Sequence, residues 1–150
     1  MLSSKAKYAL RAATRLALVA GTEAWTLTEE IATAEDIPRK FLEAILVDLR
    51  DAGIVVSRRG RAGGYQLARH PNRITAGDLI RLIDGPLALT PCSSRTKPGT
   101  CADCPGGEGC ELRHLLLKAR DAVATVLDGC SLADLARRRQ DGDLPLDFAV

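Results

Sequence analysis

Four of the five cysteines in this chain of 150 residues fall in one short segment, at Cys92, Cys101, Cys104 and Cys110. Thiolates at such spacings bind zinc or iron–sulfur clusters, and pairs of thiols form disulfides. The segment is rich in Gly and Pro and poor in apolar side chains, so it cannot fold around a core of its own. A bound metal centre or disulfides must hold it, and we favour the metal.

The N-terminus of the chain carries no signal for export or membrane insertion. Lys5, Lys7, Arg11 and Arg15 interrupt every apolar run there, so neither a secretory h-region nor a membrane span is predicted. We therefore expect a cytoplasmic protein that does not bind membranes. In a reducing cytosol, closely spaced cysteines are more often metal ligands or redox groups than disulfides. The remaining cysteine, Cys130, is expected to be a buried small side chain.

The composition is that of an ordinary globular protein, with 46% hydrophobic and 27% charged residues. The formal net charge is +2, and the basic excess lies in residues 1–81, which hold 13 Lys and Arg against 9 Asp and Glu. Cys101 and Cys104 form a CxxC pair, but the βαβ pattern of a thiol oxidoreductase is missing. Neither a Ser/His/Asp set nor a phosphate-binding loop is present, so we do not expect an enzyme.

The elements that must position the cysteines begin with three predicted helices. Apolar residues at helical spacing indicate the first over residues 4–20. Thr26 and Glu29 have the form of a capping box and open a second, short helix. Pro38 fits the first turn of a third helix, which Gly53 ends. The predicted core face of this third helix consists of Phe41, Leu42, Ile45, Leu46 and Leu49.

The second and third helices have the pattern of a helix-turn-helix, because a tight connection joins them and cations lie in the first turn of the third. Arg39, Lys40 and Glu43 are predicted to face the major groove of DNA. A plain helical bundle with a solvated basic surface would fit the helices alone. The residues that follow favour DNA binding.

A β-hairpin is predicted from two short β-runs, residues 54–57 and 65–68, with a basic, glycine-rich tip between them. Such a hairpin after a helix-turn-helix is the wing of a winged helix. Arg58, Arg59 and Arg61 lie at its tip, and we expect them to reach phosphates or the minor groove.

Two further predicted helices flank the cysteine segment, and a third, short helix follows them. Thr75 caps a fourth helix whose Leu79, Leu82 and Ile83 are predicted to point inward. Residues 112–127 form a long amphipathic helix with an apolar stripe wide enough for both the winged domain and the same helix of a second subunit. Ser131 caps the last helix. The predicted dimer interface consists of Leu112, Leu116, Ala119, Val123 and Val126.

The fold class that follows is mainly α with a small β-hairpin. We expect a winged helix-turn-helix domain over residues 1–86, a cysteine-rich loop that binds a cluster over 87–111, and the dimerisation helix with the terminal helix over 112–139. Residues 140–150 are expected to be a mobile tail, because they are rich in Asp, Gly and Pro.

Five motifs carry a family resemblance, at residues 8–11, 41–46, 49–55, 59–68 and 131–135. They resemble those of the Rrf2 family of bacterial transcription regulators, and the resemblance covers residues 4–138. It implies a winged-helix homodimer of the IscR, NsrR and RirA type, which carries an iron–sulfur cluster on three cysteines and lets the state of the cluster control DNA binding.

The same resemblance implies a ligand set. Cys92, Cys104 and Cys110 match the three family cysteines, although the gap from Cys92 to Cys104 is longer than usual and Cys101 is extra. Cys101 is therefore the most economical fourth ligand, and His114 is the next candidate. A small anion or water is the third.

Other fourth ligands of the family have no counterpart in this chain. Arg113 stands where IscR has a histidine, and an arginine cannot bind a metal. Tyr8 and Ala12 stand where some relatives carry ligands in the first helix. The cluster type, 2Fe–2S or 4Fe–4S, stays open.

The resulting hypothesis is an iron–sulfur-sensing, sequence-specific transcription regulator, with repression the expected sense. It would respond to redox state, nitric oxide or iron, and bind a near-palindromic operator in double-stranded DNA as a homodimer. The alternative is a winged-helix regulator with structural zinc or a thiol/disulfide switch at the same cysteines, with Cys101 and Cys110 as the expected pair.

Overall fold

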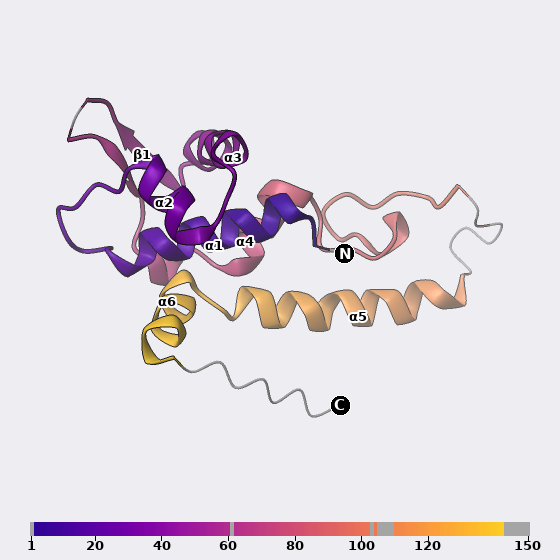
Figure 1. Cartoon of the computed structure of the whole chain (residues 1–150). Helices are drawn as coiled ribbons and strands as arrows, with labels where there is room; N and C mark the ends of the chain where they lie inside the picture. The colour runs from indigo at the N-terminus through magenta and orange to yellow at the C-terminus, as the bar shows by residue number, and fades with distance from the viewer. Residues whose placement is uncertain (1, 61, 103, 105–109, 143–150) are drawn as a thin grey trace.

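The computed structural model describes residues 2–60, 62–102, 104 and 110–142. Within these ranges the chain is mainly α-helical with one small antiparallel sheet, as predicted (Figure 1). The predicted tail began too early, because residues 140 and 141 belong to the last helix, and from 143 onward it lies outside the described residues. The elements are α1 (Ser4–Leu18), α2 (Thr28–Glu35), α3 (Arg39–Asp51), β1 (Val55–Arg58), β2 (Gly64–Leu67), η1 (Pro71–Arg73), α4 (Ala76–Asp84), η2 (Pro91–Ser93), α5 (Glu111–Asp128) and α6 (Leu132–Asp141).

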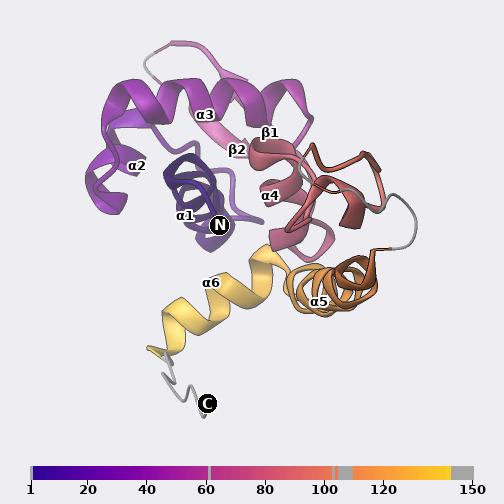
Figure 2. The same ribbon diagram turned by 90° about the vertical axis from the view of Figure 1, so that its right-hand side faces the viewer.

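Helix α1 lies at the centre of the molecule and packs against α2, α3, α4 and α6 (Figure 2). Its own buried face is built mostly from alanines, which lets the surrounding helices approach closely. The larger core side chains come from those neighbours, for example Ile31 of α2, Leu46 of α3 and Leu132 of α6. The terminal helix α6 therefore shares one hydrophobic core with the helix-turn-helix.

The N-cap of helix α2 is Leu27, one residue later than the predicted cap at Thr26. The Glu30 carboxylate, rather than that of Glu29, reaches back and accepts from the Leu27 N–H at 2.8 Å. Thr26 is not the cap, because its backbone pairs with Tyr65 of β2, with N–O distances of 2.9 and 3.1 Å. The capping prediction was wrong in register because the sheet already uses Thr26.

Helix α3 follows Pro38 and ends as predicted at Gly53, whose φ of +68° suits glycine. One member of its predicted core face is wrong, since Phe41 is 60% exposed. The buried stripe is Leu42, Ile45, Leu46 and Leu49. Each residue turns an α-helix by about 100°, so Phe41 lies about 90° from the middle of that stripe.

The predicted wing is present as β1 and β2, paired antiparallel from Val55 opposite Leu67 to Arg58 opposite Gly64. The pairing of Thr26 with Tyr65 adds the segment before α2 to the other edge of β2. The wing is thus joined to the helix-turn-helix from both sides, because β1 follows α3 directly.

Helix α4 is capped as predicted by Thr75, whose hydroxyl accepts from the Asp78 N–H at 3.1 Å. Leu79 is buried and Ile83 half-buried, but Leu82 is 38% exposed, so the prediction that it points inward was wrong. The buried stripe repeats at i, i+3, i+4 and i+7 from Ala76, and Leu82 falls off that repeat.

Helix α5 runs back from the cysteine segment to α6 and is joined firmly to α4 (Figure 1). Asp128 receives both prongs of the Arg81 guanidinium at 2.7 Å, which lowers the pKa of its carboxyl. A Cβ on Gly77 would come within 2.0 Å of the Asp128 carboxylate, so glycine permits this approach. The Ala76 N–H also donates to the Cys130 carbonyl at 2.9 Å.

A buried ion pair ties the turn of the helix-turn-helix to α1 and α6. Glu35, the last residue of α2, has a side chain that is only 2% exposed. Its two carboxylate oxygens lie 2.8 Å from Arg139 of α6 and 3.6 Å from Arg11 of α1. The next residue, Asp36, adopts a left-handed conformation with φ of +48°. Glu35 thus fixes the point where the chain turns into α3.

Removing Arg139 should destabilise the protein. In Arg139→Ala the buried Glu35 carboxylate keeps only the more distant Arg11, and a buried charge that loses a partner lowers the free energy of unfolding. We expect a loss of about 1–3 kcal/mol, measured as a lower urea midpoint at fixed protein concentration. Arg138→Ala, on the neighbouring exposed residue of α6, is the control. Equal losses in both variants would show that the ion pair contributes nothing.

Candidate metal centre and DNA-binding surface

The four clustered cysteines line one cavity of about 500 Å³. Cys92 comes from η2, which follows α4, and Cys110 is the N-cap of α5. Cys101 and Cys104 belong to the connecting segment, where the Cys104 N–H donates to the Cys101 carbonyl at 3.3 Å. The cavity therefore brings together thiols from both ends of the cysteine segment.

The thiols of Cys92 and Cys101 line the same cavity and differ in acidity. A hydrogen bond with the Thr90 hydroxyl, 3.3 Å from the Cys92 sulfur, is the main cause that lowers the pKa of Cys92, followed by one with Cys101. Two opposing effects act on Cys101. A hydrogen bond from the Cys92 backbone lowers its pKa, whereas the Cys92 side chain and burial raise it, and the net pKa of Cys101 is raised. Cys92 is the thiol of this pair that ionises first.

The first part of the cysteine segment is anchored to α5 by arginines. Arg95 donates from Nε and Nη2 to the carboxylate of Asp121, with an Nε–Oδ1 distance of 2.9 Å. Arg120 donates to the same carboxylate at 2.9 Å, and these hydrogen bonds hold the pKa of Asp121 far below its usual range. Arg113 of α5 donates to the Cys92 carbonyl at 3.4 Å. No local sequence pattern predicts the pairing of Arg95 with Asp121, because it depends on how the segment folds back on α5.

The donor set of the cavity suits a thiophilic centre. Its sulfur donors can hold zinc or an iron–sulfur cluster as thiolates. Within the described ranges, no three His, Cys, Asp or Glu side chains already have the arrangement of a metal site. His114 does not line the cavity and is exposed, whereas Arg113 lines it. The residues fit sulfur ligation by the cysteines better than ligation by His114.

The predicted DNA-reading residues at the start of α3 are exposed, and two of them are bonded to each other. The Arg39 guanidinium donates to Glu43 at 2.9 Å and to Glu29 of α2 at 3.1 Å. Lys40 is exposed beside them. These contacts hold the Arg39 side chain along the two helices of the helix-turn-helix, so its position is set before any DNA arrives.

The three wing arginines do not share one environment. Arg59 is exposed at the tip, and Arg61 lies outside the described residues. Arg58 instead covers the ring of Trp25 at 4.6 Å from its centroid and donates to the Ala62 carbonyl. Trp25 is thus a wing residue that the sequence interpretation missed, since it lies far from the hairpin along the chain.

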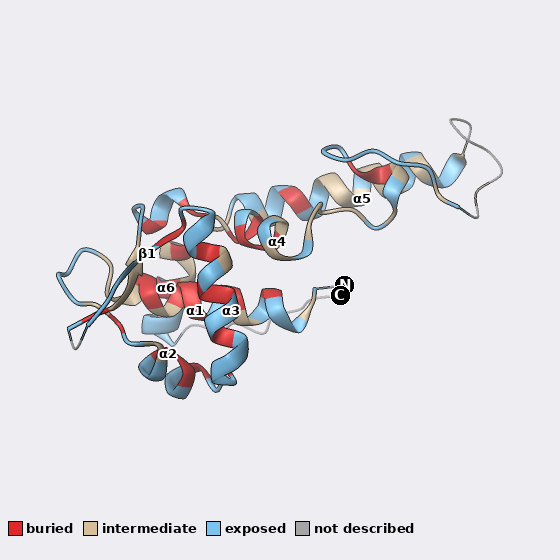
Figure 3. Cartoon of the chain, turned by 90° about the horizontal axis from the view of Figure 1, so that it is seen from above, coloured by how far each residue is buried: buried red, intermediate tan, exposed pale blue. Residues whose placement is uncertain are grey.

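The predicted interface stripe on α5 is largely uncovered in the single chain (Figure 3). Leu112, Val123 and Val126 are 62%, 49% and 70% exposed, and Leu116 and Ala119 are half-buried. Leu115 adds to the stripe with 62% of its surface exposed. An apolar row of this length on one helix is typical of a surface that meets another protein.

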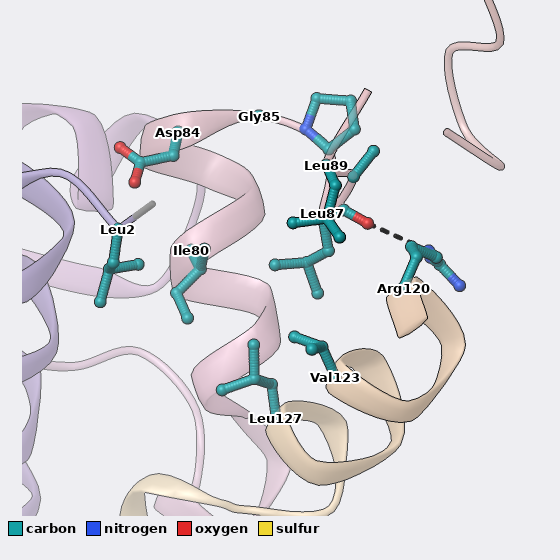
Figure 4. Close-up of a pocket in the computed structure, with 11 residues that line it drawn as sticks. Leu2, Ile80, Asp84, Gly85, Leu87, Leu89, Arg120, Val123 and Leu127 are labelled. Carbon is teal, nitrogen blue, oxygen red and sulfur yellow. Dashed lines mark hydrogen bonds between the residues drawn. The ribbon is translucent and has the colours of Figure 1, made fainter. Parts of the chain in front are cut away.

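A second cavity of about 410 Å³ adjoins this stripe where α4 and α5 meet (Figure 4). Leu87, Val123 and Leu127 point into it, and Leu89 at its edge is 64% exposed. Arg120 closes one side by donating to the Leu87 carbonyl at 3.2 Å. The apolar surface of α5 therefore continues onto residues 85–89.

Among the residues that the structure describes, no helix combines the length and the apolar character needed to cross a membrane.

Comparisons with known proteins agree with these features. Residues 2–138 match the Rrf2 family model, described as iron-dependent transcriptional regulator. An rrf2-like HTH-type transcriptional regulator of Rhodobacter capsulatus is 41% identical over 138 residues, which cover 90% of this chain and 91% of the relative.

Two solved structures extend the comparison to three dimensions. CymR, the global cysteine regulator of B. subtilis, matches with a TM-score of 0.74 and 36% identity, covering 91% of this chain and 96% of its own. IscR of T. potens matches with a TM-score of 0.74 and 28% identity, covering 96% of this chain and 91% of its own.

Proposed function

Because the chain belongs to the Rrf2 family of HTH-type transcriptional regulators, we propose that it is an iron–sulfur-sensing repressor. Cys92, Cys101, Cys104 and Cys110 hold the cluster in this proposal. The observation that carries it is that all four thiols line one cavity between the cysteine segment and the start of α5. The iron-dependent character of the family supports the choice of metal.

A thiol switch is the second candidate, because Cys92 and Cys101 line one cavity, and the pKa of Cys92 is lowered while that of Cys101 is raised. A solved structure of similar fold, CymR, is a cysteine regulator. We propose Cys92 with Cys101 as the pair of this switch, in place of the Cys101–Cys110 pair expected from the sequence. Structural zinc bound by the same four thiols is the other alternative to the cluster.

The residues around the cavity have defined tasks in the proposal. Thr90 stabilises the Cys92 thiolate, and Arg95 with Asp121 holds the segment on α5. A bound cluster supplies iron–thiolate bonds that oxygen or nitric oxide can break. Cys92 follows α4 and Cys110 opens α5, so a cluster held by both would add a link between the segment after α4 and the start of the dimerisation helix. Without that link α4 and α5 would still be joined by the Arg81–Asp128 ion pair. In this proposal the position of α5 sets the spacing of the reading heads.

Anaerobic purification tests the metal centre. The protein should be coloured, with iron and acid-labile sulfide in comparable amounts and without stoichiometric zinc. Zinc in place of iron, with no visible absorbance, would establish the structural-zinc variant. A colourless, metal-free protein that gains a disulfide on oxidation would establish the thiol switch.

We propose further that the protein binds DNA as a symmetric homodimer. Reading by one winged domain covers one half-site, so a dimer joined through α5 would address a near-palindromic operator. The half-sites would lie about 34 Å apart, one helical turn, or a multiple of that distance. The exposed apolar stripe of α5 supports this assembly.

Glu43→Ala should broaden the sequences that the protein binds more than it weakens binding to the best one. A carboxylate in the major groove accepts from the cytosine amino group and repels other edges, and a good base contact discriminates by roughly 5- to 150-fold. The measurement is the affinity for duplexes that each carry one changed base pair. Loss of Glu43 also releases Arg39, which it holds at 2.9 Å.

Arg59→Ala is the matched variant, because this exposed arginine should contact phosphate. It should weaken all duplexes alike and lower the salt slope by about one unit. If Glu43→Ala weakened every duplex by the same factor, Glu43 would not be reading bases.

A further inference from the structure

The wing contains an internal brace made by one arginine and the single tryptophan of the chain. The Arg58 guanidinium lies over the Trp25 ring, 4.6 Å from its centroid. Its Nε donates to the Ala62 carbonyl at 3.0 Å, and Nη2 donates to the same oxygen. One side chain therefore joins three segments, namely the end of β1, the returning side of the tip and the loop that leads into α2.

The backbone around the brace is set by close approaches that only glycine allows. A Cβ on Gly63 would lie 2.2 Å from the Arg58 carbonyl oxygen, and one on Gly64 would lie 2.5 Å from that of Thr26. Gln66 of β2 donates to the Ala24 carbonyl at 2.6 Å, on the same loop as Trp25. These contacts press the base of the wing against residues 24–26. Among the described residues of the tip, the Arg58 bridge and the 2.9 Å hydrogen bond from the Gly63 N–H to the Gly60 carbonyl are the contacts that hold it.

We infer that Arg58 and Trp25 are positioning residues, which set the direction of the wing tip and so place Arg59 against DNA. In this inference Arg58 does not itself neutralise a phosphate. A cation over an aromatic ring and a two-pronged hydrogen bond both hold the guanidinium at the base of the wing. The inference concerns the wing alone and is independent of what the cysteines bind.

A double-mutant cycle on DNA affinity separates positioning from direct contact. The probe is a labelled duplex of mixed sequence, about 30 base pairs or three helical turns long, titrated at low salt. Arg58→Ala and Trp25→Leu should each weaken binding by about 3- to 10-fold. Because both remove the same brace, the double variant should be no more than about twofold weaker than either single one.

Matched variants keep the test independent of folding. Lys40→Ala, at an exposed position of α3, removes a separate contact with DNA. Its fold-loss of DNA affinity should therefore multiply with that of Trp25→Leu in the double variant. Trp25→Phe keeps a ring beneath the guanidinium and should bind within about twofold of the parent. Circular dichroism should show the same helical content in all variants.

The tryptophan supplies a readout in the absence of DNA. Arg58→Ala should shift the emission of Trp25, whereas Arg59→Ala should leave it unchanged. The inference would be overturned if the losses of DNA affinity caused by Arg58→Ala and Trp25→Leu multiplied in the double variant. It would also be overturned by an Arg58→Ala variant with unchanged emission and a salt slope lowered by about one unit, which would place Arg58 on a phosphate.

Discussion

Replacing Cys104 by alanine is expected to abolish the visible absorbance of the purified protein and the response of its DNA affinity to oxygen and nitric oxide. Cys104 lines the cysteine cavity between Cys101 and Cys110, so its loss removes a central ligand of the proposed cluster. In the parent, the cluster state should change operator affinity by an amount typical of allosteric coupling, about 5- to 150-fold. The measurements are an anaerobic spectrum and DNA titrations before and after exposure to nitric oxide.

The chain offers a matched control in Cys130, which is half-buried and does not line the cavity. Cys130→Ala should keep both the absorbance and the response. Cys101→Ala separates the ligand assignments, because a protein that keeps a cluster without it must use another fourth ligand. If Cys104→Ala responded like the parent, the cluster mechanism would be wrong, and the thiol switch of Cys92 and Cys101 would take its place.

Helix ends were predictable from the sequence where the signal is local. Thr75 and Ser131 cap their helices through hydroxyls that accept from N–H groups three residues ahead, at 3.1 Å in each case. The same kind of signal failed at Thr26, since a β-bridge to Tyr65 competes for its backbone. Phe41 was wrongly assigned to the core because it precedes Ile45 by four residues, a spacing that is also typical of a buried stripe.

The contacts between distant segments were not predictable, since no local pattern specifies them. Neither the burial of Glu35 between Arg11 and Arg139 nor the cation over Trp25 leaves a periodic trace in the sequence. The cysteines were predictable as a group because they are close along the chain. How the thiols are brought to one cavity depends on how the segment folds back on α5, where Arg95 bonds Asp121.

That anchoring changes the expectation for a protein without its cluster. The sequence suggested that nothing else would hold residues 87–111. Arg95 bonded to Asp121, and Ser93 bonded to the Thr90 carbonyl at 3.0 Å, hold the part near α4 without any metal. Loss of the proposed cluster should therefore leave the winged domain and the part of the segment near α4 folded, and alter the link through the thiols to the start of α5.

Such a link can control DNA binding only if two chains are joined through α5, and Val123→Asp tests that assembly. Val123 is 49% exposed in the single chain and lies in the apolar stripe beside the cavity at α4 (Figure 4). In a dimer seam the new carboxylate would be buried without a partner, which costs several kcal/mol. We expect monomers or insoluble protein, measured by analytical ultracentrifugation, and a loss of operator binding.

Two companion variants distinguish a lost seam from a damaged helix. Lys118→Asp places the same carboxylate on another exposed part of α5 and should leave the dimer intact. Leu112→Asp, at the far end of the stripe and 62% exposed, should act like Val123→Asp if the seam follows the whole helix. A stable Val123→Asp dimer that still binds DNA would place the interface elsewhere. The coupling between the cysteine cavity and the spacing of two reading heads would then need a route that does not pass through α5.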